Sequence, residues 1–309
     1  MCVTCGCSDS KSVLITDLTQ GEHEHVDADG RVHRHVHDHD HAHDHDHDHD
    51  HDREHDHGHS HSHDHDHGHS PSQATPMTLH TPVHGKTIAL EQQILAKNQL
   101  LAERNRGWLA GREILALNLV SSPGSGKTSL LERTIRDIGA ELAISVVEGD
   151  QATLNDAQRI RATGAAAIQI NTGAGCHLEA DMLARALDAL KPPAHSIVMI
   201  ENVGNLVCPA LFDLGERAKV VILSVTEGED KPAKYPHMFK AASLMLLNKI
   251  DLLPHLRFDV ARCIAYAHAV NPGLRVLQVS AQTGEGMADW YAWLRVQLHA
   301  PAQEPALAG

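Results

Sequence analysis

The stretch SSPGSGKTS, at residues 121–129, constrains the fold more than any other part of this chain. It follows the apolar run EILALNLVS, which is typical of a buried strand, and it precedes a helical pattern. Gly124, Gly126, Lys127 and Thr128 match most of the P-loop pattern, in which glycines let backbone N–H groups surround phosphates at a helix N-terminus. A surface lysine in a glycine-rich turn is the alternative, and the flanking strand and helix argue against it. We therefore expect a phosphate-binding loop between a strand and a helix.

The polar residues of this loop have expected roles toward a nucleotide. Lys127 would reach the β- and γ-phosphates, and the Thr128 hydroxyl would hold Mg²⁺. Ser125 and Ser129 complete the expected nucleotide-binding loop. One departure is plain, because the first glycine of the pattern is Ser121 in this chain.

Seven mostly continuous apolar runs alternate with helical stretches after residue 86. The runs are EILALNLVS, ELAISVVEG, AAAIQIN, SIVMIEN, AKVVILSVT, SLMLLNK and LRVLQVS. The helical stretches include TIALEQQILAKNQLLAERN and LEADMLARALDAL. Continuous apolar strands are expected where both faces of a sheet are covered. The sequence therefore predicts an α/β domain of the P-loop NTPase type, with a mainly parallel sheet flanked by helices.

Composition divides the chain into a globular part and an unusual N-terminal region. Residues 21–70 hold twenty of the 28 histidines, interleaved with fifteen acidic residues and only three arginines. Such a tract cannot bury a core, so we predict that it is disordered without a ligand. The predicted segments are a cysteine-bearing head and linker at 1–20, the His/Asp tract at 21–70, a linker at 71–85, a nucleotide-binding domain at 86–300 and a tail at 301–309.

Charge and hydropathy exclude several classes of function. The tract accounts for −12 of the net charge of −14, so the remainder is nearly neutral and has no basic patch that would predict nucleic-acid binding. No apolar run approaches the roughly 20 residues of a membrane-spanning helix, and no signal peptide is visible. We therefore predict a cytoplasmic protein that binds neither membrane nor nucleic acid, with reduced cysteines.

A second nucleotide motif follows the sixth apolar run. NKID, at 248–251, matches the guanine-reading element of GTPases, in which Asp251 would accept two hydrogen bonds from the guanine edge. Adenine presents the wrong groups and would leave that carboxylate unpaired. Asn248 and Lys249 belong to the same element, and Ser280–Ala281 fits the loop that packs on the base. An ordinary strand-to-helix turn is the alternative for each segment.

Three carboxylates are candidates for the magnesium and catalytic site. Asp150 ends the second apolar run, Asp156 follows it, and Glu201 ends the fourth run. A carboxylate at such a strand end commonly holds Mg²⁺ in P-loop NTPases. Glu201 and Gly204 imitate a D-x-x-G switch, with Glu in place of Asp. Helix capping or a solvated loop end is the alternative for all three carboxylates.

Two groups of cysteines indicate metal binding. Cys176 and His177 adjoin before a helix, and Cys208 lies four residues beyond Gly204. Thiolate and imidazole ligands suit Zn²⁺ or Ni²⁺, and a water or a second subunit could supply a fourth ligand. The second group is Cys2, Cys5 and Cys7, which in a reducing compartment indicates metal-binding or redox activity. Cys263, in an apolar helical pattern, is expected to be a buried hydrophobic residue.

Together, the C-x-x-C-G-C head, the His tract, SSPGSGKTSLL, NTGAGCHLEA, IENVGNLVCP and NKIDLLP resemble the HypB family of nickel-incorporation GTPases in hydrogenase maturation. The resemblance covers the head and essentially all of residues 86–295. It implies a homodimeric GTPase that delivers nickel to the hydrogenase large subunit with a second accessory protein. It further implies a tight Ni²⁺ site at the head cysteines and a weaker Ni²⁺ or Zn²⁺ site at Cys176, His177 and Cys208. Ser121 is normal for this family.

Within that resemblance, the N-terminal region is predicted to store nickel. If Met1 is removed, the α-amine of Cys2 and the three head thiolates could supply four planar donors, a geometry that favours Ni²⁺. The histidines would hold many ions loosely, close to the GTPase. We expect slow GTP hydrolysis, since the sequence offers no convincing arginine finger or water-orienting glutamine. The alternatives are a urease-type nickel GTPase and a passive nickel or zinc storage protein.

Overall fold

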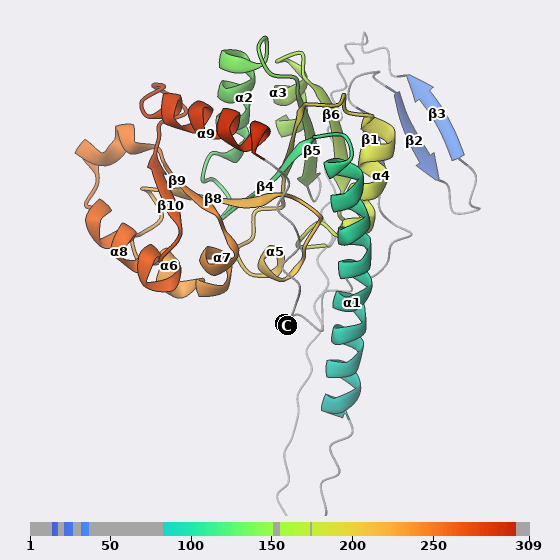
Figure 1. Cartoon of the computed structure of the whole chain (residues 1–309), viewed down its shortest axis with the longest axis horizontal. Helices are drawn as coiled ribbons and strands as arrows, with labels where there is room; N and C mark the ends of the chain where they lie inside the picture. The colour runs from blue at the N-terminus through green and yellow to red at the C-terminus, as the bar shows by residue number, and fades with distance from the viewer. Residues whose placement is uncertain are drawn as a thin grey trace, which may run out of the picture.

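The structure, a computed structural model, describes residues 14–17, 22–26, 32–36, 83–150, 155–173 and 175–300. Its main body is an eight-stranded sheet with helices on both faces (Figure 1). The strands of this sheet are β1 (Leu14–Asp17), β4 (Leu115–Ser121), β5 (Ile144–Asp150), β6 (Ala166–Asn171), β7 (Ile197–Glu201), β8 (Ala218–Ser224), β9 (Leu244–Asn248) and β10 (Arg275–Gln278).

The strand order is β1-β6-β5-β7-β4-β8-β9-β10. Every pair from β6 to β10 is parallel, and β1 runs antiparallel to β6 at the edge. The predicted α/β fold with a mainly parallel sheet is therefore confirmed, and each of the seven apolar runs forms one of its strands. All seven residues of β4 are buried, as expected for a central strand covered on both faces.

Helices cover the two faces of the sheet in separate groups. They are α1 (Val83–Ala110), α2 (Lys127–Ile138), α3 (Asn155–Arg161), α4 (Ala180–Leu190), α5 (Cys208–Leu211), α6 (Lys231–Lys234), α7 (Pro236–Ala241), the 3₁₀ helix η1 (Ile250–His255), α8 (Val260–Val270) and α9 (Met287–His299). Alternate residues of β4 show the division between the two faces. Leu117 and Leu119 pack with α2, α3 and α9, whereas Ala116 packs with α1 and α4, and Val120 packs with α7 and α8.

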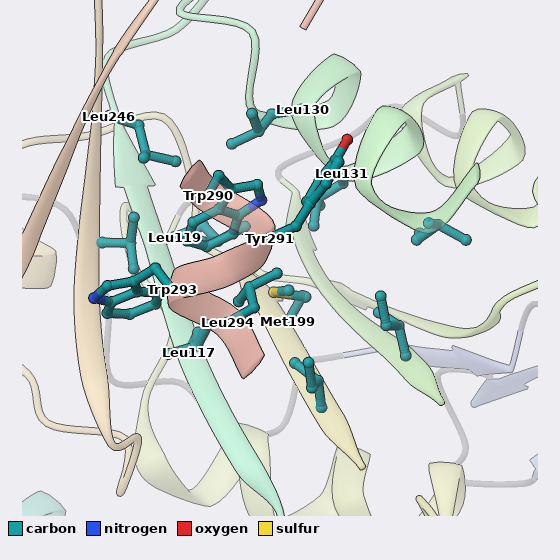
Figure 2. Close-up of a cluster of buried hydrophobic side chains, with 14 of the residues drawn as sticks. Leu117, Leu119, Leu130, Leu131, Met199, Leu246, Trp290, Tyr291, Trp293 and Leu294 are labelled. Atoms are coloured by element: carbon teal, nitrogen blue, oxygen red, sulfur yellow. The ribbon is translucent and has the colours of Figure 1, made fainter. Parts of the chain in front are cut away.

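Helix α9 fixes α2, the helix that begins at the predicted phosphate-binding loop. The side chain of Trp290, a residue of α9, is buried against the sheet next to Leu119 and Leu130 (Figure 2). Its indole Nε1 donates a hydrogen bond to Thr134 Oγ1 of α2 at 3.0 Å. Trp293 stacks on Trp290 with 5.4 Å between ring centroids. The loop at the start of α2 therefore rests on a well-packed support.

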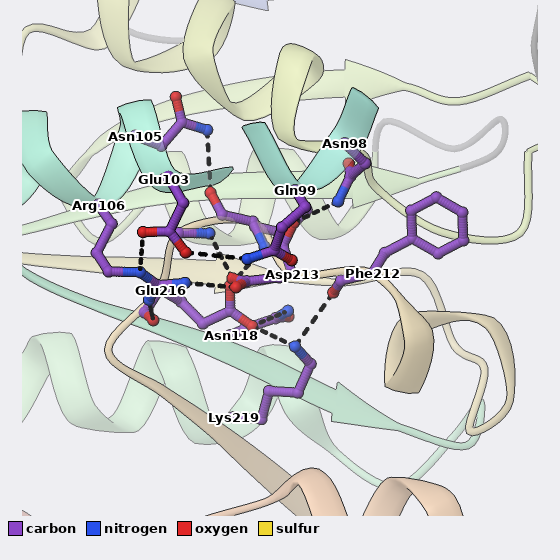
Figure 3. A network of polar contacts seen from close by, with 12 residues as sticks. Asn98, Gln99, Glu103, Asn105, Arg106, Asn118, Phe212, Asp213, Glu216 and Lys219 are labelled. Carbon is purple, nitrogen blue, oxygen red and sulfur yellow. Dashed lines mark hydrogen bonds and ion pairs between the residues drawn. The ribbon is translucent and has the colours of Figure 1, made fainter. Parts of the chain in front are cut away.

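A buried polar network fixes α1 on the opposite face (Figure 3). Arg106 donates to the backbone carbonyl of Glu216 at 2.8 Å and forms an ion pair with Asp213. The Glu216 carboxylate accepts hydrogen bonds from Asn118 of β4 at 3.1 Å and from Lys219 of β8 at 2.6 Å. Buried charges are stable only when they are paired in this way. The network ties α1 to two central strands.

Three short strands precede α1, where the sequence reasoning expected none. One is β1 at the sheet edge, and the others, β2 (Glu22–Val26) and β3 (Val32–Val36), pair antiparallel with each other. Both segments alternate with a period of two, and the residues between them include Asp-Gly, a pairing typical of hairpin connections. The other residues of the predicted head and tract, Cys2, Cys5 and Cys7 included, lie outside the described residues. No helix in the described part of the chain is long and apolar enough to cross a membrane.

Candidate nucleotide and metal sites

The loop between β4 and α2 has the conformation that a phosphate-binding loop requires. Gly124 and Gly126 adopt positive φ angles of 74° and 95°, a region that favours glycine. A Cβ atom on Gly126 would lie 2.7 Å from Asn248 Nδ2, so this position has no room for a side chain. Lys127 begins α2, and its Nζ lies 2.8 Å from Ser121 Oγ. α2 begins here, and a helix N-terminus presents backbone N–H groups that can bind an anion.

This loop forms one wall of a cleft of about 660 Å³ at the carboxyl ends of the central strands, where open α/β sheets bind ligands. The cleft joins the loop to the ends of β5 and β7 and to the segment after β7. Its lining residues are Pro123, Gly124, Gly126, Lys127, Thr128, Ser129, Glu148, Gly149, Asp156, Arg159, Cys176, Glu201, Asn202, Val203, Gly204, Asn205 and Lys249.

Thr128 and Glu201, two of the predicted magnesium ligands, are in direct contact. The Thr128 hydroxyl donates to Glu201 Oε1 at 2.9 Å. Burial raises the pKa of Glu201 to about 7, although Lys127 acts to lower it. The second oxygen, Oε2, is buried and has no hydrogen-bond partner among the described residues. An unpartnered buried carboxylate oxygen beside a hydroxyl fits a divalent cation that prefers oxygen ligands, so the site suits Mg²⁺.

The other two predicted magnesium ligands, Asp156 and Asp150, are less clearly positioned to hold a metal ion. Asp156 lines the cleft, but its carboxylate forms an ion pair with Arg159 at 3.1 Å. Asp150 is the last residue of β5 and lies in register with Asn171 of β6. The side chain of Asp150 is outside what the structure describes. The residue of this strand that lines the cleft is Glu148, which is buried.

The predicted guanine-reading residues connect the predicted phosphate loop to the loop after β10. Asn248 donates from Nδ2 to the Ser125 carbonyl at 3.0 Å and accepts from the Ala281 N–H at 3.3 Å. Lys249 Nζ donates to the Gly124 carbonyl at 2.7 Å. The structure thus places residues from motifs that are distant in the sequence in direct contact.

Asp251 is oriented by the loop that was predicted to pack on the base. Ser280 donates from Oγ to Asp251 Oδ1 at 2.5 Å. The same hydroxyl accepts the Thr283 N–H at 3.0 Å, which fixes its direction. The remaining lone pairs of the carboxylate are left for a ligand with adjacent N–H donors, which guanine has.

Cys176, His177 and Cys208 lie together beside the cleft. One ligand atom from each lies within 4.8 Å of the others. Cys176 Sγ is 2.9 Å from Cys208 Sγ and 3.4 Å from His177 Nδ1. The two thiols form no disulfide in the described structure. Three soft or borderline donors converge on one point, as in a zinc or nickel site that lacks its fourth ligand.

Burial keeps His177 in the neutral form that can bind a metal ion. The residue is 5% exposed, and its ring lies 3.9 Å from that of Phe212, centroid to centroid. Burial lowers its pKa to about 4, so the imidazole is neutral near pH 7 and can bind a metal. Its Nε2 is buried without a hydrogen-bond partner among the described residues and lies 3.9 Å from Glu179 Oε1. These donors fit a soft or borderline cation.

The cleft is also lined by charged residues that the sequence pattern did not select. Glu148 is the register partner of Glu201 across the β5–β7 pair, so two buried carboxylates lie next to each other. Arg159 lines the cleft and donates to Ser129 Oγ at 3.0 Å and to Glu132 at 2.7 Å. The alternation in VVEGD places residues 148 and 150 on the same face of the strand, which was the available signal for Glu148.

Asn202 and Asn205 connect the cleft to the loop that carries Cys176. Asn202 accepts the Leu178 N–H at 3.2 Å and donates to Asn118 at 3.1 Å. Asn205 donates to the Cys176 carbonyl at 3.2 Å. No local pattern marked these two asparagines, because their partners lie 24 and 29 residues away in the chain. Cys263, in contrast, is fully buried in α8 as the sequence predicts.

This fold and this cleft define a nucleotide-binding protein of the P-loop class. The chain matches the family model "CobW/HypB/UreG, nucleotide-binding domain" over residues 115–278. It is 63% identical over 211 residues to "Hydrogenase maturation factor HypB" from Rhizobium leguminosarum bv. viciae, covering 68% of this chain and 71% of that protein. The chain belongs to the HypB family.

Solved structures agree with this assignment. HypB from Archaeoglobus fulgidus is 41% identical with a TM-score of 0.62, covering 66% of this chain and all of that one. HypB from Helicobacter pylori, solved in complex with nickel, is 35% identical with a TM-score of 0.63, covering 69% of this chain and all of that one.

Proposed function

We propose that this protein is a GTP-hydrolysing nickel metallochaperone that stores nickel and delivers it to the large subunit of [NiFe]-hydrogenase. The observation that carries the proposal is that Cys176, His177 and Cys208 cluster beside the nucleotide cleft, with Cys176 in its wall. Glu201 ends β7 at the cleft, and the segment that follows leads to Cys208 at the start of α5. The names of the relatives, a hydrogenase maturation factor and a nickel complex, support the same proposal.

In this proposal the chain acts on GTP mainly by position and charge. Lys127 and the N–H groups at the start of α2 bind the phosphates, and Asn248 and Asp251 select guanine. Thr128 and Glu201 are the residues that would hold Mg²⁺, with Asp150 and Asp156 as further candidates. Bound Mg²⁺ would neutralise the charge that develops on the phosphates during transfer to water.

Hydrolysis is expected to be slow. Arg159 lines the cleft, but Glu132, Asp156 and Ser129 bind its guanidinium. An arginine committed to these partners cannot reach transferring phosphate without first breaking the contacts, and an arginine finger contributes a factor of about 10³–10⁵ to the rate. We expect a partner or a second copy of the chain to supply what is missing.

The N-terminal region and the partners belong to the same proposal. Cys2, Cys5 and Cys7 would hold Ni²⁺ tightly, and the histidines of residues 21–70 would store further ions. The G-domain cluster would take Ni²⁺ or Zn²⁺, with its fourth ligand from water or from the second subunit of a homodimer. A second hydrogenase accessory protein and the hydrogenase large subunit would be the cytoplasmic partners.

Nickel binding by the full-length protein tests this proposal. Wild type would be titrated against a competing chelator, with and without a non-hydrolysable GTP analogue and Mg²⁺, beside a Cys2/Cys5/Cys7→Ala variant and a Cys208→Ala variant. We expect the first variant to lose the tightest site and the second to lose a weaker, nucleotide-responsive site. If both bind as wild type does and nucleotide changes nothing, the storage alternative replaces this proposal.

Urease-type delivery remains the second candidate, since the matching family model also includes UreG. The cysteine head favours hydrogenase. Transfer of ⁶³Ni from the loaded protein to apo-hydrogenase large subunit, compared with transfer to apo-urease, distinguishes the two.

A further inference from the structure

Asn205 lies between the two sites and contacts the loop that carries Cys176. Its Nδ2 donates to the Cys176 backbone carbonyl at 3.2 Å, and its Oδ1 accepts the Val207 N–H at 2.8 Å. Asn205 also lines the nucleotide cleft. One amide group therefore touches the backbone of one metal-site cysteine and shapes the turn that leads to the other, Cys208.

The residue before Asn205 packs tightly against the phosphate loop. A Cβ atom on Gly204 would lie 3.0 Å from Pro123 Cγ and 3.2 Å from Pro123 Cα. The backbone at residue 204 therefore rests on the loop that binds phosphate, with no space between them. A displacement of either segment must be transmitted to the other, because packed elements do not deform continuously.

The loop of residues 176–178 is also held from its other side. A Cβ atom on Gly149, near the end of β5, would lie within 2.8–2.9 Å of the Leu178 side chain. Asn202 accepts the Leu178 N–H at 3.2 Å. Asn202 is 1% exposed and is tied to the core through Asn118, so it forms a fixed anchor. Asn205 is only partly buried, so it is the contact that can change at low cost.

We infer that Asn205 is the positioning residue that couples the two sites, so that its bond to the Cys176 carbonyl transmits the state of the nucleotide cleft to the metal cluster. The inference rests on the proposed function and names the residue through which its two sites communicate. Coupling in binding free energy is reciprocal, so metal must change nucleotide affinity by the same factor that nucleotide changes metal affinity. The bond needs the amide donor of Asn205 and not only its acceptor.

Because the coupling is reciprocal, it can be measured through nucleotide affinity in the full-length chain. The dissociation constant of a fluorescent, non-hydrolysable GTP analogue would be measured with Mg²⁺, with and without saturating Ni²⁺. The ratio of the two constants reports coupling and is not obscured by nickel on the histidine tract. A Cys208→Ala variant, which keeps the tract, is expected to give a ratio of one. Wild type is expected to give a ratio that differs from one by roughly 5- to 150-fold.

Two substitutions separate coupling from turn formation. Asn205→Asp keeps the acceptor for the Val207 N–H but loses the donor to Cys176, and Asn205→Ala loses both. In both variants, the nucleotide dissociation constants with and without nickel are expected to be nearly equal, so that their ratio is near one. Asn271 is a matched control, because its Nδ2 donates to the Phe239 and Ala242 carbonyls and its Oδ1 accepts the Gly273 N–H, again two residues ahead. Asn271→Asp is expected to keep the wild-type ratio.

The outcomes separate this inference from the function on which it rests. Wild-type ratios in both Asn205 variants, with a ratio of one in Cys208→Ala, would overturn the role of Asn205 and leave the coupled switch standing. A ratio of one in wild type would overturn both. A loss of coupling in Asn271→Asp equal to that in Asn205→Asp would show general loosening and would also overturn the inference. Thermal unfolding of each variant confirms that it is folded.

Discussion

Replacement of Asp251 by asparagine tests the proposed reading of guanine. The carboxylate already accepts one hydrogen bond from Ser280 at 2.5 Å, which orients it and leaves its other lone pairs for a base. Guanine offers two adjacent donors, and a hydrogen bond to a charged group contributes about 1.5–3 kcal/mol. The amide introduced by Asp251→Asn would retain one acceptor oxygen and bring an N–H₂ group toward a donor. Loss of one to two such bonds predicts GTP binding weaker by roughly 10- to 10⁴-fold.

Xanthosine triphosphate supplies the complementary measurement, because it carries a carbonyl where guanine has its exocyclic amine. Asp251→Asn should bind it better than wild type does. Fluorescence competition with both nucleotides gives the two affinities. Asp259→Asn is a suitable control, since Asp259 accepts the Arg262 N–H at the start of α8 and has no part in the cleft. GTP affinity within about twofold of wild type in Asp251→Asn would refute the assignment of the base site.

Three further predictions address the phosphate loop, the core and acid stability. Gly126→Ala should weaken GTP binding by more than about tenfold while the protein stays folded, because its Cβ would lie 2.7 Å from Asn248 Nδ2 at a φ of 95°; calorimetric titration with nucleotide and circular dichroism measure the two effects. Trp290→Ala should lower the free energy of unfolding by about 3–5 kcal/mol, as urea denaturation would report, since it removes a 1% exposed indole bonded to Thr134. Asp137 loses solvation by partial burial, but the hydrogen bonds from Arg133 and Tyr291 outweigh this and hold its pKa below the usual value. The stability it contributes is therefore present above the unfolded-state pKa of about 3.9 and is lost as pH falls through the folded-state value, so the gap in unfolding free energy between wild type and Asp137→Asn should narrow in acid denaturation series.

The sequence was sufficient for the seven parallel strands of the sheet. Continuous apolar runs identify β4 to β10, because burial on both faces leaves a pattern that depends on each strand alone. The glycines of the phosphate loop are equally local, since Gly126 is required by its own φ angle and by one close neighbour. Features of this kind depend on short segments, and a single sequence contains them.

What the sequence could not supply depends on register and on distant partners. The run VVEGD offers Glu148 and Asp150 on one face, and only the pairing of β5 with β7 sets Glu148 beside Glu201. The polar network at α1 could not be predicted for the same reason, because Asn118 and Glu216 form a hydrogen bond although they are 98 residues apart in the sequence (Figure 3). The segments of β2 and β3 alternate with a period of two, but they lie in a tract whose composition is typical of disorder.

The contacts between the two sites also bound how far nucleotide can drive metal release. Two hydrogen bonds to the backbone of residues 176–178, from Asn205 to the Cys176 carbonyl and from the Leu178 N–H to Asn202, join this loop to the segment after β7, beside the contact between the sulfur atoms of Cys176 and Cys208. At about 0.5–1.5 kcal/mol each, their loss changes metal affinity by at most about 3 kcal/mol, or roughly 150-fold. A change from 99:1 to 1:99 in the ratio of occupied to empty clusters needs a change in affinity of about 10⁴-fold. On the proposed function, a change in these two bonds alone therefore loosens nickel but does not empty the cluster. The receiving protein must supply the remainder by offering stronger ligands, which predicts that release is efficient only within the complex.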